Sequence, residues 1–385
     1  MTNLLYNKSS YIKTFTAAVL SCEKTESGAY DVTLDRTAFF PEQGGQDSDR
    51  GSIGGVRVTD VQIHGDTVYH TVEAPLQVGT CVEGVIDWVR RFDYMQNHTG
   101  EHIVSGILHS KYGYDNVGFH LGNEVMTLDT SGPLTHEQLA EVEISANKAV
   151  YENVPVVVFY PDAASLSDME YRAKLDLTEN VRIVTITGWD VCACCAPHVA
   201  HTGEVGIIRI IGAMRWKGGM RLTLVCGARA VSDASMRAEQ LSRISEALSA
   251  KPEETYEAFC RVQNTVSEQK SEILRLKREL LEVRLAAVEQ TAGSLCLFFE
   301  DADNDMLRAA VNACVPKCGG LCGVFSGSDT DGYRFVMGAA DIPLRARAKE
   351  ITAALNGRGG GSDQMISGSV KATAAEIRAY FSSFA

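Results

Sequence analysis

Apolar and polar residues alternate along the first 90 residues, in short runs separated by glycine-rich turns. The run Val56–Ile63 shows this period of two, and Tyr30–Leu34 is a second strand-like run. A period of two is typical of strands that bury one face. We therefore predict a β-rich, barrel-like domain over residues 1–90.

The period lengthens to that of a helix after residue 90, and a strand-like run, Val181–Ile186, follows later. Helical spacing places a set of apolar residues on one face of a helix. These residues are Met95, Ile103, Val104, Ile107 and Leu108. Residues 91–230 are therefore expected to form a mixed α/β domain.

Residues 231–292 are nearly free of glycine, and Lys251-Pro252 marks a turn within them. Apolar residues there follow a 4-3-4-3 spacing with one polar break. The positions are Val262, Val266, Gln269, Ile273, Leu276, Leu280, Val283 and Ala287. This pattern predicts a helical hairpin whose stripe either packs within the chain or forms an intermolecular coiled coil. A homodimer through residues 231–385 is therefore possible.

The pattern changes again over residues 293–385. Leu295–Phe299 and Gly320–Ser326 are typical of buried strands, and Met306–Val311 is typical of a helix between them. A βαβ arrangement follows, with a glycine-rich loop at Gly357–Ser362. Altogether the fold class is α+β.

Composition narrows the class of protein. A hydrophobic content of 45% can build real cores, but no run of eighteen apolar residues predicts a membrane span. The N-terminus has no signal-peptide core, so eleven cysteines are expected as reduced thiols in a cytoplasmic protein.

The net charge of −13 argues against a nucleic-acid partner, but a basic strip between residues 205 and 231 qualifies this. The strip contains Arg209, Arg215, Lys217, Arg221 and Arg229. It is either a phosphate-binding surface or a solvated strand edge protected by charge.

Two pairs of residues have the spacing of metal ligands. His98 and His102 are four residues apart on the predicted helix, and Cys194 and His198 have the same spacing. Each pair alone can be explained without a metal, for example as histidines that are partly buried in the protein core. Together they supply three imidazoles and a thiolate, which is enough to hold one zinc ion. Pro197 predicts that a turn, not a helix, presents the second pair.

Neighbouring residues leave two questions at this site. The first is whether Cys192 or Cys195, and not Cys194, is the thiol ligand. Glu101 invites comparison with zinc proteases, but those need the glutamate directly after the first histidine. Since Glu101 directly precedes His102, the protease interpretation fails.

A glycine motif, Thr37–Gly51, follows the strand-like run near residue 30. Gly44 and Gly45 within it permit positive φ or close approach of a ligand to the backbone. In isolation such a segment is a turn between strands. Here it precedes the two metal-ligand pairs and contains Thr37 and Gln46.

These three motifs, followed by Thr202-Gly203-Glu204, resemble the editing domain of alanyl-tRNA synthetases and its free-standing relatives, the alanyl-tRNA editing proteins of the AlaX type. The resemblance covers roughly residues 15–230. It implies a zinc site of His98, His102, Cys194 and His198, in a trans-acting hydrolase (a deacylase) that cleaves tRNA(Ala) mischarged with serine or glycine.

The resemblance also implies roles for two residues of the glycine motif. Thr37 would hydrogen-bond the hydroxyl of serine, and Gln46 would orient substrate or water. The chain departs from the synthetases at Cys195–Pro197, where they usually carry Gly-Gly-Thr. No aminoacylation domain is expected, because the editing motifs begin near the N-terminus.

The tail resembles the DHHA1 domain of alanyl-tRNA synthetases and DHH phosphoesterases, which contributes to RNA binding and to dimers. Its glycine-rich loop at Gly357–Ser362 can cradle phosphate, but it is not a nucleotide P-loop. The chain lacks the Asp-His-His core, which argues against a phosphoesterase. Simple burial is the favoured explanation of Cys314, Cys318 and Cys322. The alternative for the whole chain is a zinc-stabilised RNA-binding module without catalysis.

Overall fold

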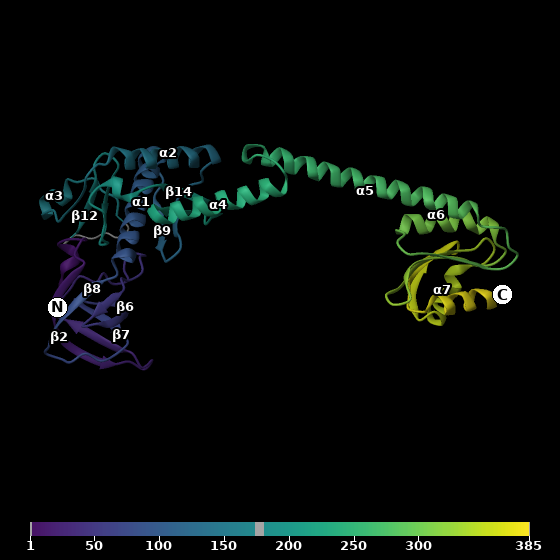
Figure 1. Cartoon of the computed structure of the whole chain (residues 1–385), viewed down its shortest axis with the longest axis horizontal. Coiled ribbons are helices and arrows are strands. Elements are labelled where there is room, and N and C mark those ends of the chain that lie inside the picture. Colours follow the sequence, from purple (N-terminus) through teal and green to yellow (C-terminus); the bar gives the residue numbers. More distant parts are fainter. Residues whose placement is uncertain (1, 174–180, 385) are drawn as a thin grey trace. The chain divides into compact units, whose positions relative to one another are not determined.

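The structure is a computed structural model that describes residues 2–173 and 181–384. It contains two compact units, Met1–Arg243 and Ile244–Ala385 (Figure 1). Helices and strands mix in both units, so the predicted α+β class is confirmed. The finer division at residues 90, 230 and 292 remains a prediction.

Six short strands at the start of the first unit form a closed barrel, in which every neighbouring pair is antiparallel. Their inward residues, such as Val32, Val58 and Val68, are fully buried. In order around the barrel, the strands are β2 (Thr14–Lys24), β3 (Tyr30–Leu34), β7 (Thr67–Val72), β6 (Val56–His64), β5 (Gly51–Ile53) and β8 (Cys81–Ile86). A small parallel pair, β1 (Asn3–Leu4) and β4 (Arg36–Thr37), lies beside it.

Helix α1 (Trp88–Tyr112) is the helix that the apolar spacing predicts. Asp87 caps its start by accepting a hydrogen bond from the backbone N–H of Arg90, and Gly113 ends it at a φ of +68°. Nearly all side chains from Tyr94 to Leu108 are buried, which is unusual for a helix at the surface. The helix therefore lies inside the unit, where neighbouring elements contact it on several sides.

Two glycines let other elements approach α1 closely. A Cβ on Gly100 would lie 2.3 Å from the Sγ of Cys226, and one on Gly106 would lie 2.2 Å from the carbonyl oxygen of Trp189. Glycine within a helix costs about 1 kcal/mol relative to alanine. Here it brings the backbone of α1 against two separate sheets.

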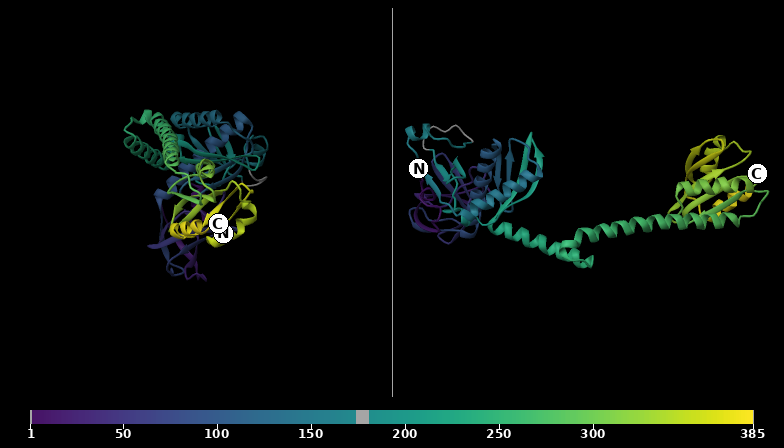
Figure 2. Two further views of the ribbon diagram at one scale, coloured as in Figure 1. Left: turned by 90° about the vertical axis from the view of Figure 1, so that its right-hand side faces the viewer. Right: turned by 90° about the horizontal axis from the view of Figure 1, so that it is seen from above.

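Those two sheets complete the first unit, whose strands and helices Figures 1 and 2 show in purple to teal. Both are antiparallel. The larger has the order β14 (Ile208–Trp216), β15 (Gly219–Cys226), β10 (Met126–Thr130) and β9 (Asn116–Leu121), and the smaller has β11 (Val156–Phe159), β12 (Ile183–Ile186) and β13 (Asp190–Ala193). The accompanying helices are α2 (His136–Glu152), α3 (Ala163–Ser167) and the start of α4 (Gly227–Ala247).

The basic strip of residues 205–231 is largely paired with acids. Arg221 makes a two-pronged contact with Asp129, at 2.7 and 2.8 Å. Arg229 does the same with Asp93, and Arg209 lies 3.2 Å from Glu143. Three of the five cations are therefore paired with acids within the unit, which argues against one continuous phosphate-binding strip. Of these three, only Arg209 lies on the edge strand β14, so the explanation as a protected sheet edge applies to Arg209 and not to Arg221 or Arg229.

The second unit begins with the end of α4 and contains a five-stranded sheet with helices. Strands β16 (Leu295–Phe299) and β17 (Cys322–Ser328) are parallel and joined through helix α6 (Asn304–Cys314), so the predicted βαβ arrangement is confirmed. Cys314 and Cys322 are fully buried there, in agreement with simple burial, whereas Cys318 is only partly buried. The sheet order is β16 (Leu295–Phe299), β17 (Cys322–Ser328), β18 (Gly332–Gly338), β20 (Met365–Val370) and β19 (Gly357–Gly361), and the helices are α5 (Thr255–Ala286), α6 (Asn304–Cys314), α7 (Leu344–Ala354) and α8 (Ala374–Ser383).

The predicted glycine-rich loop at Gly357–Ser362 is wrong over most of its length. Gly357–Gly361 is the edge strand β19, paired antiparallel with β20. A Cβ on Gly361 would lie 2.2 Å from the carbonyl oxygen of Met365, so the glycines fit close backbone pairing. The backbone is extended and hydrogen-bonded to a neighbouring strand, which is not a phosphate-cradling loop.

Helix α5 carries the predicted heptad stripe, and its apolar side chains are substantially exposed. Val266 is 39% exposed and Val283 is 68% exposed, with the other aliphatic stripe residues from Val262 to Leu280 in between. Helices at both predicted positions are confirmed, but the contact that the stripe makes remains a prediction. Among the described residues, no helix combines the length and apolar character needed to cross a membrane.

Candidate metal centre

Four side chains from two distant parts of the chain meet at the middle of α1. His98 and His102 project from α1, while Cys194 and His198 lie in the irregular segment after β13. Their ligand atoms all lie within 4.8 Å of one another. The Cys194 Sγ is 3.5 Å from His98 Nε2 and 3.4 Å from His198 Nε2. This cluster can therefore hold one metal ion.

Each imidazole has a separate partner on its other nitrogen. His98 Nδ1 lies 2.7 Å from Gln46 Oε1, and His102 Nδ1 lies 3.0 Å from Asp190 Oδ2. Both partners are acceptors, so Nδ1 carries the proton and Nε2 is left for the metal. His198 Nδ1 is 3.0 Å from the hydroxyl of Thr99. The three rings are thus fixed in orientation before any ion binds.

Sequence reasoning missed Thr99, Asp190 and Arg172. Asp190 is buried, and Arg172 binds it through two N–H groups at 2.7 and 2.8 Å. A signal was available in the alternation of strand residues. Asp190, Cys192 and Cys194 are two residues apart, which places them on one face of an extended segment. Nothing comparable in the sequence points to Thr99 or Arg172.

The three neighbouring thiols have different surroundings. Cys194 is the one that contacts His98 and His198. Cys192 instead groups with His102 and Asp190. Cys195 packs with Tyr6 and Phe40, and its Sγ would lie 3.5 Å from a Cβ on Gly44. The geometry therefore favours Cys194 over Cys192 and Cys195 as the thiol ligand.

Charge in the cluster favours a thiolate. Burial alone would raise the pKa of Cys194, but the rings of His98, His198 and His102 hold that pKa well below its usual value. Burial opposes protonation of His102, yet Cys192, Cys194 and Asp190 raise its pKa well above 6.5. Burial lowers the pKa of His198 to about 3. The thiolate is the form that binds metal.

Gln46 is the residue of the glycine motif that reaches the cluster. Gly44 and Gly45 have φ values of +65° and +82°, and they turn the chain so that Gln46 and Gln43 pair with each other. The Oε1 of Gln46 faces His98, as described above. In the part of the chain that the structure describes, its Nε2 is buried without a hydrogen-bond partner. One N–H donor group is therefore uncommitted beside a metal ligand.

Thr37 lies fully buried on the barrel side of the motif. Its hydroxyl is 2.8 Å from His70 Nε2 and accepts a hydrogen bond from the backbone N–H of Phe39 at 3.1 Å. His70 Nδ1 is 3.0 Å from the carbonyl oxygen of Val32, so Nδ1 is the protonated nitrogen. His70 Nε2 therefore accepts the proton of Thr37. Burial lowers the pKa of His70 to about 4, which keeps the ring neutral.

A buried ion pair joins the glycine motif to α1. Arg91 contacts both carboxylate oxygens of Asp49 and donates to the carbonyl oxygens of Ala38 and Ser10. Asp49 in turn accepts the backbone N–H of Phe40 at 2.6 Å. Both charged side chains are almost fully buried. Removing one partner of such a pair would leave an uncompensated buried charge, so the motif is firmly anchored to the helix.

Comparisons with known proteins agree with this site. Residues 181–244, which include Cys194 and His198, match the family described as the threonyl and alanyl tRNA synthetase second additional domain. Residues 3–90 match the class II (A) tRNA synthetases. The alanyl-tRNA editing protein Aarsd1-A of Xenopus laevis is 32% identical over 301 residues, covering 75% of this chain and 72% of that protein. The chain belongs to the alanyl-tRNA editing proteins.

Other relatives extend the similarity within this family. Aarsd1 of Mus musculus is 28% identical over 331 residues, covering 80% of each protein. The alanine–tRNA ligase of Ignicoccus hospitalis is 30% identical, and the chain spans 36% of its length. A crystal structure of the C-Ala domain from Aquifex aeolicus alanyl-tRNA synthetase shares 19% identity, covering 25% of this chain and 96% of that one. Its TM-score of 0.21 is too low to establish a shared fold.

Proposed function

We propose that this alanyl-tRNA editing protein hydrolyses the ester of tRNA(Ala) mischarged with serine or glycine, using a zinc ion. The observation that supports this most is the convergence of His98, His102, Cys194 and His198, whose ligand atoms lie within 4.8 Å of one another. Three imidazole nitrogens and a thiolate form a donor set that suits zinc. The Nδ1 atoms of His98 and His102 fit the same ion, because Nδ1 donates to Gln46 or to Asp190 and Nε2 of each ring is left to face the metal.

When bound, zinc supplies Lewis-acid chemistry that polarises an ester carbonyl. Gln46 contributes a hydrogen bond from the chain itself. Its Oε1 is committed to His98, whereas its Nε2 is an unused donor. A donor pairs with an oxygen acceptor, not with the ammonium group of the aminoacyl moiety. We therefore assign Gln46 to the ester carbonyl or to the oxygen of the attacking water.

Thr37 provides the discrimination between amino acids in this proposal. Its proton is given to His70, and one lone pair accepts from Phe39. One lone pair remains, so Thr37 acts toward the substrate as an acceptor. Serine offers the O–H that this acceptor needs, and alanine does not. A polar site that is left unpaired rejects the ligand that lacks the partner.

The direct test is hydrolysis of Ser-tRNA(Ala), Gly-tRNA(Ala) and Ala-tRNA(Ala) with and without a chelator. We expect the seryl or glycyl ester to be cleaved and the alanyl ester to persist, with activity lost on chelation. His102→Ala should lose activity and metal together. His109→Ala is the matched control, because His109 lies on the same helix, exposed and paired with Asp115.

The same experiment separates catalysis from a purely structural zinc site. Four protein ligands are also typical of structural zinc, as in an RNA-binding module. If tRNA binds and zinc is present, but no ester is hydrolysed, the hydrolase proposal is wrong and the binding module stands. Equal hydrolysis of seryl and alanyl esters would contradict an editing role.

A further inference from the structure

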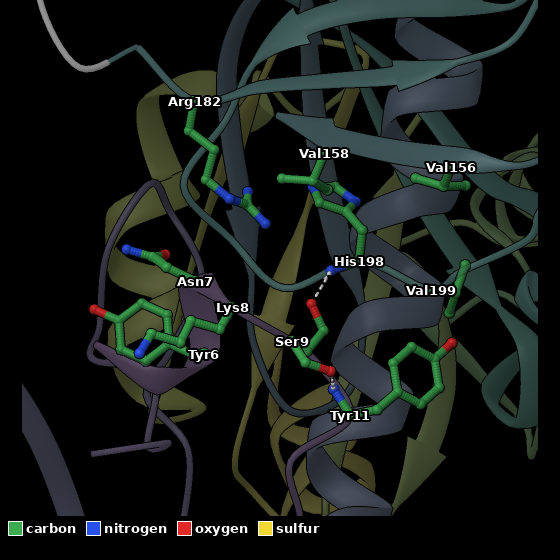
Figure 3. A pocket seen from close by; sticks show the side chains of 11 residues that line it. Tyr6, Asn7, Lys8, Ser9, Tyr11, Val156, Val158, Arg182, His198 and Val199 are labelled. Carbon is green, nitrogen blue, oxygen red and sulfur yellow. Dashed lines mark hydrogen bonds between the residues drawn. The ribbon is translucent and has the colours of Figure 1, made fainter. Parts of the chain in front are cut away.

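A cavity of about 150 Å³ adjoins the metal cluster on the side of His198 (Figure 3). Its walls come from the N-terminal segment around Tyr6 and Lys8, from the sheet strand of Val158, and from Arg182 and His198. One water takes about 30 Å³ in the liquid, so the space exceeds a single water or small ion. The cavity therefore borders His198, one of the four candidate ligands, on the side that faces away from the cluster.

The charge of the cavity is opposite to that of the protein. Its lining includes the cations Lys8 and Arg182, and no acid is found among the described residues that form it. The chain as a whole has a net charge of −13. Local cations inside an acidic molecule attract anions to that one place and not to the rest of the surface.

The contacts that hold the Arg182 side chain use Nη1 and leave the Nε edge of the guanidinium without a hydrogen bond in the described part of the chain. The side chain is only 8% exposed, and its Nη1 donates to the carbonyl oxygens of Cys194 and Ala196 at 2.7 and 2.9 Å. Its Nε is buried without a hydrogen-bond partner in residues 2–173 and 181–384. In Figure 3 the guanidinium points between Tyr6 and Val158, into the cavity. An arginine that offers its Nε side to an anion is suited to two-pronged recognition of a phosphate.

We propose that this cavity binds the 5′-phosphate and ribose of the 3′-terminal nucleotide of the tRNA, with Arg182 and Lys8 as phosphate ligands. This inference rests on the proposed function, since that function places the aminoacyl ester at the metal. The ester is carried by the ribose of the same nucleotide, so its phosphate must lie within one nucleotide of the cluster. A cationic cavity that shares His198 with the cluster meets this requirement.

Binding of small nucleotides tests the cavity without any hydrolysis. The full-length, zinc-loaded protein is titrated calorimetrically with adenosine, with adenosine 5′-monophosphate and with inorganic phosphate. We expect the monophosphate to bind about tenfold more tightly than adenosine, with the difference shrinking at high salt. Inorganic phosphate should bind more weakly than adenosine 5′-monophosphate, because it lacks the ribose. If phosphate alone binds as tightly as the nucleotide, the cavity is a simple anion site and the proposal is wrong.

Variants assign the effect to the cavity. Lys8→Glu reverses an exposed charge and should abolish the advantage of the monophosphate, while zinc content stays the same. Lys24→Ala is the control, because Lys24 is an exposed lysine at the end of β2, outside the cavity. Arg182→Lys keeps the charge but loses the planar edge, and we expect it to weaken the monophosphate about tenfold. If Lys8→Glu still binds adenosine 5′-monophosphate about tenfold more tightly than adenosine, the proposal is wrong. This holds even if Arg182→Lys loses zinc by disturbing the ligand segment.

Hydrolysis then separates this inference from the proposed function. Seryl esters of adenosine and of adenosine 5′-monophosphate should differ in KM in the wild type and not in Lys8→Glu. If neither ester nor Ser-tRNA(Ala) is cleaved, the hydrolase proposal fails while the calorimetric result still stands. If both are cleaved with the same KM by the wild type, the hydrolase survives and the cavity assignment fails.

Discussion

The hydroxyl of Thr37 is the single group on which we expect selectivity to depend. Thr37→Val keeps the shape of the buried side chain and removes the acceptor. A buried hydrogen bond of this kind is worth about 1 to 3 kcal/mol. The ratio of kcat/KM for Ser-tRNA(Ala) over Ala-tRNA(Ala) should therefore fall by about ten- to a hundredfold.

Deacylation rates on both substrates measure this ratio, and thermal unfolding reports whether the variant still folds. Thr33→Val is a suitable control, because Thr33 is a largely buried threonine of the same barrel whose hydroxyl pairs with Ser21. An unchanged ratio in Thr37→Val would show that Thr37 is only a structural residue of the turn.

His70 gives the barrel a pH dependence of definite sign. Burial lowers its pKa from 6.5 to about 4 in the folded chain. As pH falls, the unfolded chain therefore takes up the proton first. The stability contributed by neutral His70 is fully present above pH 6.5 and is lost as pH falls to about 4, amounting to about 3 kcal/mol.

Nuclear magnetic resonance titration of the histidine rings checks this directly. The His70 ring should become protonated only near pH 4, whereas a ring that titrates near 6.5 would contradict the lowered pKa. In urea unfolding, the stability of His70→Gln should decline less than that of the wild type between pH 6.5 and 4.

Asp190 is expected to set metal affinity through the orientation of His102. Asp190→Asn removes the charge that Arg172 and His102 both contact. Loss of such an outer partner typically weakens metal binding about ten- to a hundredfold. Competition with a zinc-binding dye measures this. Asp115→Asn is the matched control, since Asp115 holds the Nδ1 of exposed His109 in the same way, at 2.9 Å.

The four candidate ligands were predictable because each pair carries its own local spacing in the sequence. Of the residues around them, only Asp190 has a sequence signal of its own, which is its alternation with Cys192 and Cys194. Thr99 lies 99 residues from His198, and Asp190 lies 88 residues from His102, so no local pattern links either residue to the ring that it orients. His70 is a lone histidine in an alternating strand, and its bond to Thr37 depends on how the barrel closes.

At the scale of elements, the glycine motif works by close approach of two backbones. A Cβ on Gly45 would lie 2.5 Å from the carbonyl oxygen of Phe119, and its φ of +82° disfavours other residues. Gly45→Ala should therefore shift the turn and draw Gln46 away from His98. We expect a loss of about 1 to 3 kcal/mol in stability, together with a fall in kcat.

Gly55→Ala separates backbone strain from the steric effect. Gly55 has nearly the same φ, +80°, but a Cβ there would meet nothing within 4 Å. It should cost stability alone and leave deacylation of Ser-tRNA(Ala) unchanged. If both variants lose activity equally, strain and not the position of Gln46 explains the effect.

Elements with a strong period were predicted well, and those without one were not. The stripe from Met95 to Leu108 predicted α1 because that helix buries apolar residues at helical spacing. Gly357–Gly361 has only one side chain, that of Arg358, and therefore shows no period, so its pairing as β19 could not be inferred. The ladder to β20 comes from tertiary context and not from local preference.

At the scale of the whole molecule, the proposed roles in hydrolysis and in RNA binding fall in different units. Every candidate ligand, together with Thr37 and Gln46, belongs to Met1–Arg243. A chain that ends at Arg243 should therefore bind zinc and deacylate weakly. It should lose affinity for tRNA if the second unit contributes to RNA binding, which we propose from the resemblance of its sequence to the DHHA1 domain. Filter binding on both chains measures this, and equal affinity would exclude that role.

The heptad stripe of α5 leads to a prediction about assembly. Apolar residues at 39% to 68% exposure along a 32-residue helix are costly to leave in water. Because their spacing is that of a coiled coil, we expect the full chain to form a homodimer through this stripe. Light scattering should give twice the mass of 41.8 kDa. The double substitution Ile273→Asp and Leu280→Asp should yield a monomer, whereas the double substitution Asn264→Asp and Ser271→Asp, on the exposed face opposite the stripe, should not. A monomeric wild type would exclude the dimer, and the stripe would then have to be covered within the chain.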